Sequence, residues 1–106
     1  MLTISKDNEV QTVVTTFEVA PGTCQDLLDE LTTACDAFVS QQPGFVGAAM
    51  HVNDAQTRIA NYVQWKTRDD FQAMLRSVEM QGYHQKFNAL CKNFEPVMYD
   101  VVVSVG

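Results

Sequence analysis

The chain has 106 residues, of which 46% are hydrophobic and 19% are charged, a composition expected of one globular domain spanning residues 1–106. Its formal net charge of −6 argues against a nucleic acid or an anionic membrane as partner, because both bind through a basic surface. No window approaches the apolar length of a membrane span, and the first residues lack the apolar core of a signal peptide. We therefore expect a cytoplasmic protein.

The three cysteines, Cys24, Cys35 and Cys91, form no C-x-x-C pair and have no histidine at zinc-ligand spacing. Cys24 and Cys35 lie about three turns apart in a predicted helix, which is too far for a disulfide. The acidic residues are dispersed, without paired carboxylates or a metal-like cluster. The sequence therefore predicts reduced cysteines and no metal site.

The first half of the chain predicts a strand followed by an amphipathic helix. Residues 11–19 are rich in β-branched side chains, and Ala20-Pro21-Gly22 ends the strand. Thr23, with Asp26 three residues later, has the spacing of a helix N-cap. The helix is expected to end near Ser40, and its apolar residues recur at helical spacing: Leu27, Leu28, Leu31, Ala34, Cys35 and Phe38.

Residues 45–52 and 57–65 predict two strands joined as a hairpin by a short loop of turn-forming residues. We expect Val52 to pair with Thr57. The apolar-or-large positions of the second of these strands alternate and would share one face: Ile59, Asn61, Val63 and Trp65. The other face of the hairpin mixes aromatic and polar residues in the manner of a subunit interface: Phe45, Ala49, His51, Arg58, Tyr62 and Gln64.

A second helical region follows, in which Thr67 and Asp70 repeat the N-cap spacing. Its expected inward residues are Phe71, Met74, Leu75 and Val78. Gly82 is expected to interrupt the helix, and residues 83–91 predict one or two further turns. After Pro96, residues 97–105 predict a long final strand.

The predicted order β-α-β-β-α-β is that of the α+β, ferredoxin-like fold with an antiparallel sheet. Helices on only one face of a four-stranded sheet leave its other face without cover. An exposed apolar face of that size usually associates, so we expect a homodimer.

Asn61 is the one polar residue in the apolar row that leads to Trp65. Leaving a buried amide without partners costs about 1 to 3 kcal/mol. In one interpretation the Asn61 amide holds neighbouring backbone and Trp65 fills the core. In the other, the two residues line a ligand pocket, where Asn61 is the polar anchor.

Four segments carry a family resemblance over nearly the whole chain: Gln42-Pro43-Gly44-Phe45, Asn61-Tyr62-Val63-Gln64-Trp65, Lys66-Thr67-Arg68-Asp69-Asp70-Phe71 and Tyr83-His84. They resemble the antibiotic biosynthesis monooxygenase family of dimeric α+β barrels, which includes cofactor-independent quinol and anthrone oxygenases. The resemblance implies a dimeric α/β barrel and a monooxygenase that uses O2 without a cofactor.

In anthrone-oxidising members an Asn and a Trp on this strand face the ligand, which the resemblance carries to Asn61 and Trp65. Such members also use a Tyr in the following helix and an Arg further on, where this chain has Phe71 and Gln85-Lys86. Haem-degrading members need an Asn on the first strand and a His in the second helix. This chain has no such Asn and carries Leu75-Arg76 at the position of the His.

The hypothesis from the sequence is a monooxygenase that oxidises a small phenolic or quinol-like aromatic with O2, without metal or flavin. Asn61 and Trp65 would donate hydrogen bonds to the developing oxyanion, and His84 is the candidate general base. The candidate substrate-binding residues are Phe71, Met50, Met74 and Tyr83. Two alternatives stay open: a non-catalytic dimeric barrel that binds a small hydrophobic ligand, and a haem-binding or haem-degrading relative.

Overall fold

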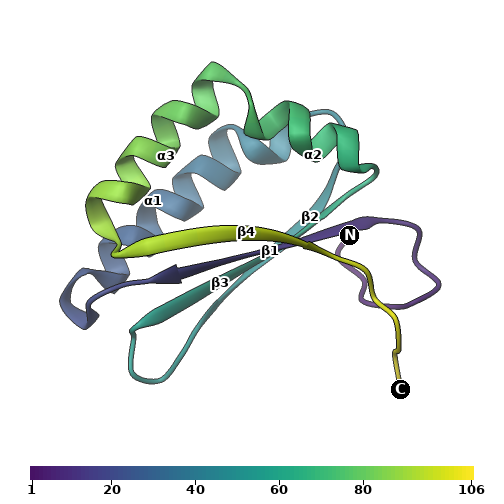
Figure 1. Cartoon of the computed structure of the whole chain (residues 1–106), viewed down its shortest axis with the longest axis horizontal. Coiled ribbons are helices and arrows are strands. Elements are labelled where there is room, and N and C mark those ends of the chain that lie inside the picture. The colour runs from purple at the N-terminus through teal and green to yellow at the C-terminus, as the bar shows by residue number, and fades with distance from the viewer.

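The computed structural model describes all 106 residues and has an antiparallel sheet with its helices on one face (Figure 1). The elements are β1 (Gln11–Glu18), η1 (Pro21–Thr23), α1 (Cys24–Ala37), η2 (Val39–Gln41), β2 (Phe45–Val52), β3 (Arg58–Trp65), α2 (Arg68–Leu75), α3 (Val78–Leu90) and β4 (Asn93–Tyr99). The predicted α+β, ferredoxin-like arrangement is confirmed.

The sheet has the strand order β2-β3-β1-β4, so the first strand of the chain is central. In register, Thr15 of β1 lies opposite Asn61 of β3 on one side and opposite Pro96 of β4 on the other. A proline is tolerated in β4 because this strand is at the edge of the sheet. Three residues far apart in the sequence therefore lie side by side across the middle of the sheet.

The core lies between the sheet and the helices. The predicted alternation along β3 is confirmed there: Ile59, Val63 and Trp65 are buried, and Trp65 is only 1% exposed. From β1, Val13 and Phe17 join them on the helix-facing side. The row that contains Asn61 thus points at the helices.

The hairpin between β2 and β3 differs from the predicted register by two residues, because Val52 pairs with Ile59 rather than with Thr57. The Asn53 side-chain oxygen accepts hydrogen bonds from the backbone N–H groups of Thr57 and Arg58, each at 2.9 Å. These bonds make Thr57 part of the turn. A shift of two residues leaves each side chain on its predicted face.

Phe45 is the exception, and its placement on the open face was wrong. A bulge between Phe45 and Gly47 breaks the alternation of β2. The Phe45 ring therefore lies edge-on against the Trp65 ring, with 5.8 Å between their centroids, on the helix-facing side.

The predicted Thr67 N-cap is confirmed, since its hydroxyl accepts the backbone N–H of Asp70 at 3.1 Å. Thr23 makes no such bond, because its backbone is already helical and the chain enters α1 through the 3-10 turn η1. Gly82 does not interrupt the second helical region, which breaks earlier. There Ser77 caps α3 by accepting the N–H of Met80, and Val78, expected inside, is 79% exposed.

The last strand, β4, begins and ends earlier than predicted: it spans Asn93–Tyr99 rather than residues 97–105. β4 pairs only with β1, and its final partner is Thr12, opposite Tyr99. Beyond Tyr99 no strand is left to pair with, so residues 100–106 leave the sheet despite their β-branched composition (Figure 1, yellow). Val102, Val103 and Val105 are exposed as a result.

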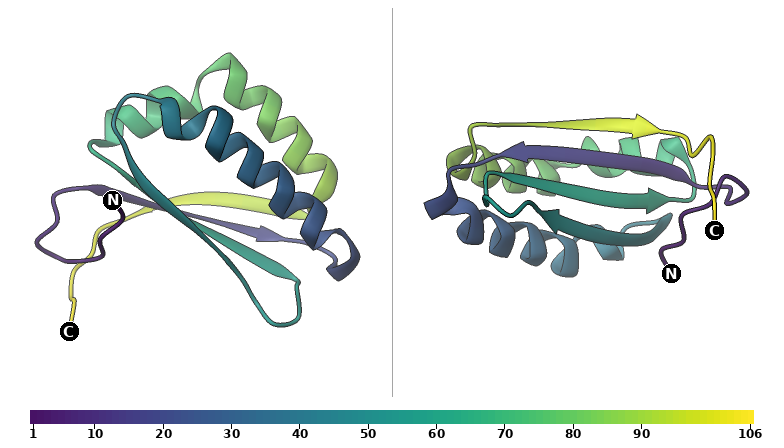
Figure 2. Two further views of the ribbon diagram at one scale, coloured as in Figure 1. Left: turned by 180° about the vertical axis from the view of Figure 1, so that it is seen from behind. Right: turned by 90° about the horizontal axis from the view of Figure 1, so that it is seen from below.

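The face of the sheet opposite the helices has no helix over it (Figure 2, right). At one end the N-terminal segment crosses it: the Gln64 side chain bonds both the N–H and the C=O of Thr3. Beyond this contact, one row of paired residues runs across the middle of the open face: Ala49, Tyr62, Val14 and Val97.

We expect this row to be the centre of a homodimer interface, because an apolar sheet face without cover associates. Sedimentation should show a dimer at micromolar concentration, and Val14→Lys should shift it toward monomer. Val78→Lys, which also places a cation at an apolar position but on exposed α3, should leave the dimer intact. A stable folded wild-type monomer at micromolar concentration would contradict the expectation.

Gly44→Ala is expected to lower the free energy of unfolding by about 1 to 3 kcal/mol. Gly44 has a φ of 85°, and a Cβ there would collide with the side chain of Asp70 in the first turn of α2. Gly82→Ala is the matched control: this helical position has open space around it, so stability should rise by about 0.5 to 1 kcal/mol. Denaturant titration measures the free energy of unfolding of both variants. A Gly44→Ala variant as stable as the wild type would contradict the predicted collision.

Candidate active site

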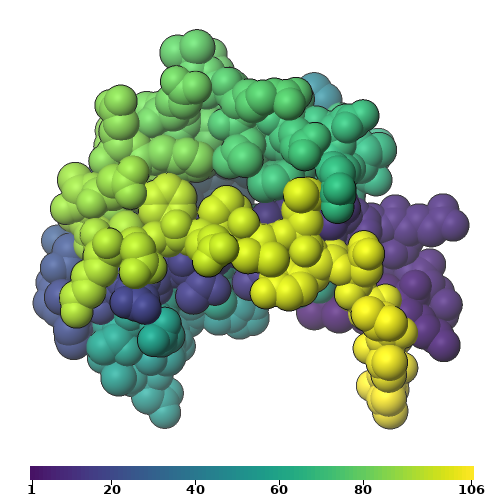
Figure 3. Space-filling view, viewed as in Figure 1, coloured from purple at the N-terminus to yellow at the C-terminus, as the bar shows by residue number.

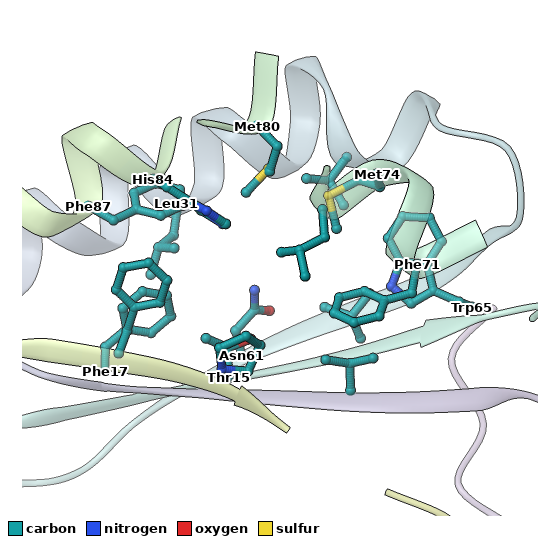
Figure 4. Close-up of a pocket in the computed structure, with 16 residues that line it drawn as sticks. Thr15, Phe17, Leu31, Asn61, Trp65, Phe71, Met74, Met80, His84 and Phe87 are labelled. Carbon is teal, nitrogen blue, oxygen red and sulfur yellow. The ribbon is translucent and has the colours of Figure 1, made fainter. Parts of the chain in front are cut away.

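A cavity lies between the sheet and the helices (Figure 4). Its volume is about 60 Å³. It is lined by Val13, Thr15, Phe17, Leu31, Val39, Asn61, Val63, Trp65, Phe71, Met74, Leu75, Met80, His84, Phe87, Phe94 and Pro96. Cavities that hold small-molecule ligands are larger, on the order of 300 to 1,000 Å³, so an aromatic ligand needs this cavity to widen.

The mouth of the cavity lies between β4 and the helices α2 and α3. On that side the lining residues are partly exposed, namely Leu75, His84, Phe94 and Pro96. The space-filling view shows a hollow there, between the yellow strand and the green helices (Figure 3). Substrate entering by this route would meet His84 at the rim and Asn61 on the floor.

Asn61 supplies an unpaired polar group on the cavity floor. Its amide points from β3 toward the helices (Figure 4), and its Oδ1 is buried with no hydrogen-bond partner. An unpaired buried carbonyl costs about 1 to 3 kcal/mol, which a ligand donor would recover. The structural interpretation of Asn61 required its amide to bond neighbouring backbone. The Asn61 Oδ1 makes no such bond.

Trp65 forms one end of the cavity and is fixed by its neighbours. Its ring centroid is 5.8 Å from that of Phe45 and 6.3 Å from that of Phe71. The next backbone N–H, that of Lys66, donates to the Gly44 carbonyl at 2.7 Å and anchors the end of β3. The indole is therefore a rigid wall that carries one N–H donor.

His84 lies at the opposite end of the cavity, in the second turn of α3. Figure 4 shows a ring nitrogen directed toward the interior. The ring packs 5.3 Å from the centroid of Phe94 and 6.1 Å from that of Phe87. Burial lowers the pKa of the imidazole from 6.5, because the charged form loses hydration. At neutral pH the side chain is therefore neutral, with one nitrogen free to accept a proton.

The structure brings together five of the seven candidate site residues: Asn61, Trp65, His84, Phe71 and Met74. Met50 does not line the cavity, and its sulfur faces the Thr32 hydroxyl at 4.0 Å. Tyr83 does not line it either, because its ring packs against Phe38 with centroids 5.9 Å apart. Helix α3 turns adjacent residues to different sides, so only His84 of the Tyr83-His84 pair reaches the interior.

Thr15 is a polar cavity residue that the sequence did not single out. It lies opposite Asn61 in the register of β1 with β3, so its hydroxyl and the amide share the floor. Thr15 alternates with Val13 and Phe17 along β1, and all three line the cavity. Its partner depended on the strand order, which the pattern alone does not give.

No group of three or more His, Cys, Asp or Glu side chains is placed to hold a metal ion. The three cysteines are free, and burial raises the pKa of the Cys35 and Cys91 thiols. None of the helices has both the length and the apolar character needed to cross a bilayer.

Comparison with known proteins points in one direction. The family model for antibiotic biosynthesis monooxygenases matches residues 10–86. The tetracenomycin-F1 monooxygenase of Streptomyces glaucescens is 30% identical over 106 residues, covering 100% of this chain and 94% of the relative.

Two solved structures share the fold. SnoaB, a cofactor-independent oxygenase from Streptomyces nogalater, superposes with a TM-score of 0.75 at 22% identity over 92% of this chain and 98% of its own. A monooxygenase from the ActVA-Orf6 gene of Streptomyces coelicolor, in complex with nanaomycin D, superposes with a TM-score of 0.80 at 18% identity over 96% and 97%.

The matched residues 10–86 run from β1 into α3 and include Asn61, Trp65 and His84. The cavity-lining residues outside that range come from the end of α3 and from β4. This chain belongs to the antibiotic biosynthesis monooxygenase family and is a monooxygenase.

Proposed function

We propose that this monooxygenase oxidises a small phenolic or quinol-like aromatic with O2 and without metal or flavin. The observation that carries the proposal is the unpaired side-chain oxygen of Asn61, Oδ1, inside a cavity walled mainly by apolar and aromatic side chains. A relative of the same fold is a cofactor-independent oxygenase. A flat aromatic with one or two hydroxyl or keto groups matches both the walls and the polar floor.

The first step is removal of a proton from the ring system by His84. Its lowered pKa keeps the imidazole neutral, so it is ready to accept the proton at neutral pH. The electron pair of the broken C–H or O–H bond stays on the aromatic, which becomes an electron-rich anion. Its negative charge is concentrated on the phenolic or keto oxygen.

Asn61 and Trp65 stabilise that oxygen. The Asn61 Nδ2 and the Trp65 indole Nε1 are the N–H donors of the floor and end wall, and both residues are held by the strand β3. Donors fixed in a dry cavity stabilise developing charge more strongly than water does, because they need no reorganisation. The Asn61 Oδ1 is free to accept a hydrogen bond from a neighbouring phenol.

Dioxygen then takes electrons from the anion and forms a C–O bond, giving a peroxide anion. The proton held by His84 returns to it and produces a hydroperoxide. Loss of water breaks the O–O bond and leaves a carbonyl, so the ring CH2 and O2 become C=O and H2O. The apolar walls exclude bulk water during these steps.

Oxygen uptake tests the proposal. Chelator-treated protein, shown to be free of flavin by its absorption spectrum, should consume O2 with anthrone and release anthraquinone in equal amounts. The same solution without protein gives the background rate. Quenching of Trp65 fluorescence by anthrone with no O2 uptake above background would contradict the proposed reaction, because the aromatic would then bind without being oxidised.

A further inference from the structure

Thr15 carries the one polar group of the cavity that the proposed reaction does not use. Apart from the Trp65 indole, the lining residues with a polar side chain are Thr15, Asn61 and His84. Thr15 lies on the central strand β1, paired with Asn61 on one side and with Pro96 on the other. Figure 4 shows Thr15 next to Asn61 on the floor. Since Pro96 is at the mouth, Thr15 lies between the mouth and the Asn61 amide.

These two polar neighbours do not satisfy each other. Paired residues of antiparallel strands have β-carbons about 4.5 to 5.5 Å apart, so one ligand can contact both side chains. The Asn61 Oδ1 has no hydrogen-bond partner, so the Thr15 hydroxyl does not donate to it. The other residues beside Thr15 on this face have no polar side chain, namely Val13, Phe17 and Pro96. The hydroxyl is therefore available to a ligand, next to an amide oxygen that is also available.

Packing alone does not explain a threonine at this position. A β-branched side chain suits a strand, and valine offers the same shape without the hydroxyl. Valine occupies the preceding position on the same face, at Val13. Strand propensity and volume therefore account for the branched shape of Thr15 but not for its hydroxyl.

A second polar contact would fix the orientation of an aromatic in the cavity. Held by Asn61 alone, a flat ligand can turn about the oxygen that the amide binds. The Thr15 hydroxyl can donate a hydrogen bond to a neighbouring ligand oxygen or accept one from it. This second bond stops the rotation, so that one ring carbon stays directed at the base His84.

We propose that Thr15 is a specificity-determining residue: its hydroxyl binds a second oxygen of the substrate, on the mouth side of the oxygen held by Asn61. The inference rests on the proposed function and narrows its substrate class. The preferred substrates are fused aromatics with a hydroxyl on the ring position next to the reacting keto or phenolic oxygen. An aromatic without that hydroxyl binds more weakly and in more than one orientation.

Trp65 is the single tryptophan and forms a cavity wall, so quenching of its fluorescence measures binding. The ligands are anthrone and the hydroxyanthrone whose hydroxyl lies next to the keto group. Titration under nitrogen prevents turnover and gives the dissociation constant alone. We expect the wild type to bind the hydroxyanthrone about tenfold more tightly than anthrone, the effect of one additional hydrogen bond.

Thr15→Val removes the hydroxyl and keeps the branched shape. It should bring the ratio of the two affinities close to one and leave the affinity for anthrone unchanged within about twofold. Thr15→Ser keeps the hydroxyl and should keep the preference. Thr16→Val is the matched control, because the same change at the exposed next residue of β1 should leave both affinities unchanged. Thermal melting shows that each variant is folded.

Equal affinities of the wild type for the two ligands would overturn the proposal. So would a Thr15→Val variant that keeps the wild-type ratio, or a Thr15→Ser variant that loses it. The proposed function fails separately: in air, the hydroxyanthrone would bind with an affinity that depends on Thr15 but cause no O2 uptake.

Discussion

His84→Gln is expected to lower turnover by about 10²- to 10⁴-fold, the usual contribution of a general base. Glutamine keeps a polar group at the rim of the cavity but cannot accept a proton. The measurement is the initial rate of O2 uptake at saturating substrate, with thermal melting to show that the variant is folded. His51→Gln is the matched control, because the other histidine is exposed on β2 and should leave the rate unchanged.

The pH profile gives His84 a second test. Burial lowers its pKa from 6.5, so the neutral base is fully present above pH 6.5, and the rate should fall only as the pH drops through the lowered pKa. The same shift affects stability. Below pH 6.5 the unfolded chain binds the proton more readily than the folded chain, so the His84 contribution is lost as the pH falls through the folded pKa. The His84→Gln profile should lack this acidic limb, and a variant that keeps both the limb and the wild-type rate would remove His84 from the mechanism.

Asn61→Leu is expected to reduce turnover by about 10²-fold, the usual loss for one oxyanion donor. Because the side-chain oxygen of Asn61 has no hydrogen-bond partner, an apolar side chain of similar size should leave the melting temperature unchanged or raise it. Oxygen uptake and thermal melts on the same preparation measure both quantities. Asn88→Leu, at an exposed position of α3, is the control for the chemical change alone.

The opposite result has a definite meaning. Suppose that the free energy of unfolding of Asn61→Leu is lower by about 1 to 3 kcal/mol and that its activity per folded molecule is unchanged. Asn61 would then serve the fold rather than the ligand. Trp65 would then be a core residue.

The sequence predicted the fold where the periodicity was decisive. The alternation that ends in Trp65 and the Thr67 cap that follows it both appear in the structure. The errors arose where a single contact overrides the pattern. The Asn53 side chain extends the hairpin turn, and the bulge after Phe45 reverses its face. Neither contact leaves a periodic signal in the sequence.

The candidate site was predictable in its strand residues and less so in its helical ones. A strand has only two faces, so the apolar residues that alternate along β3 were enough to predict the face on which Asn61 lies. Position on a helix depends on where the helix begins, and the break at Ser77 rather than Gly82 sets the direction of every residue in α3. In the helix that begins there, His84 lines the cavity and Tyr83 does not.

The strand order has a consequence for how the protein is made. The central strand β1 is synthesised first, but its neighbours are β3 and β4, both of which come later in the chain. A nascent chain therefore holds a β-rich segment with both edges unpaired until β3 is available. The cavity floor takes Thr15, Asn61 and Pro96 from three strands, so it is completed only when the last strand pairs. A nascent chain in which β4 has not yet paired with β1 therefore has an incomplete cavity floor.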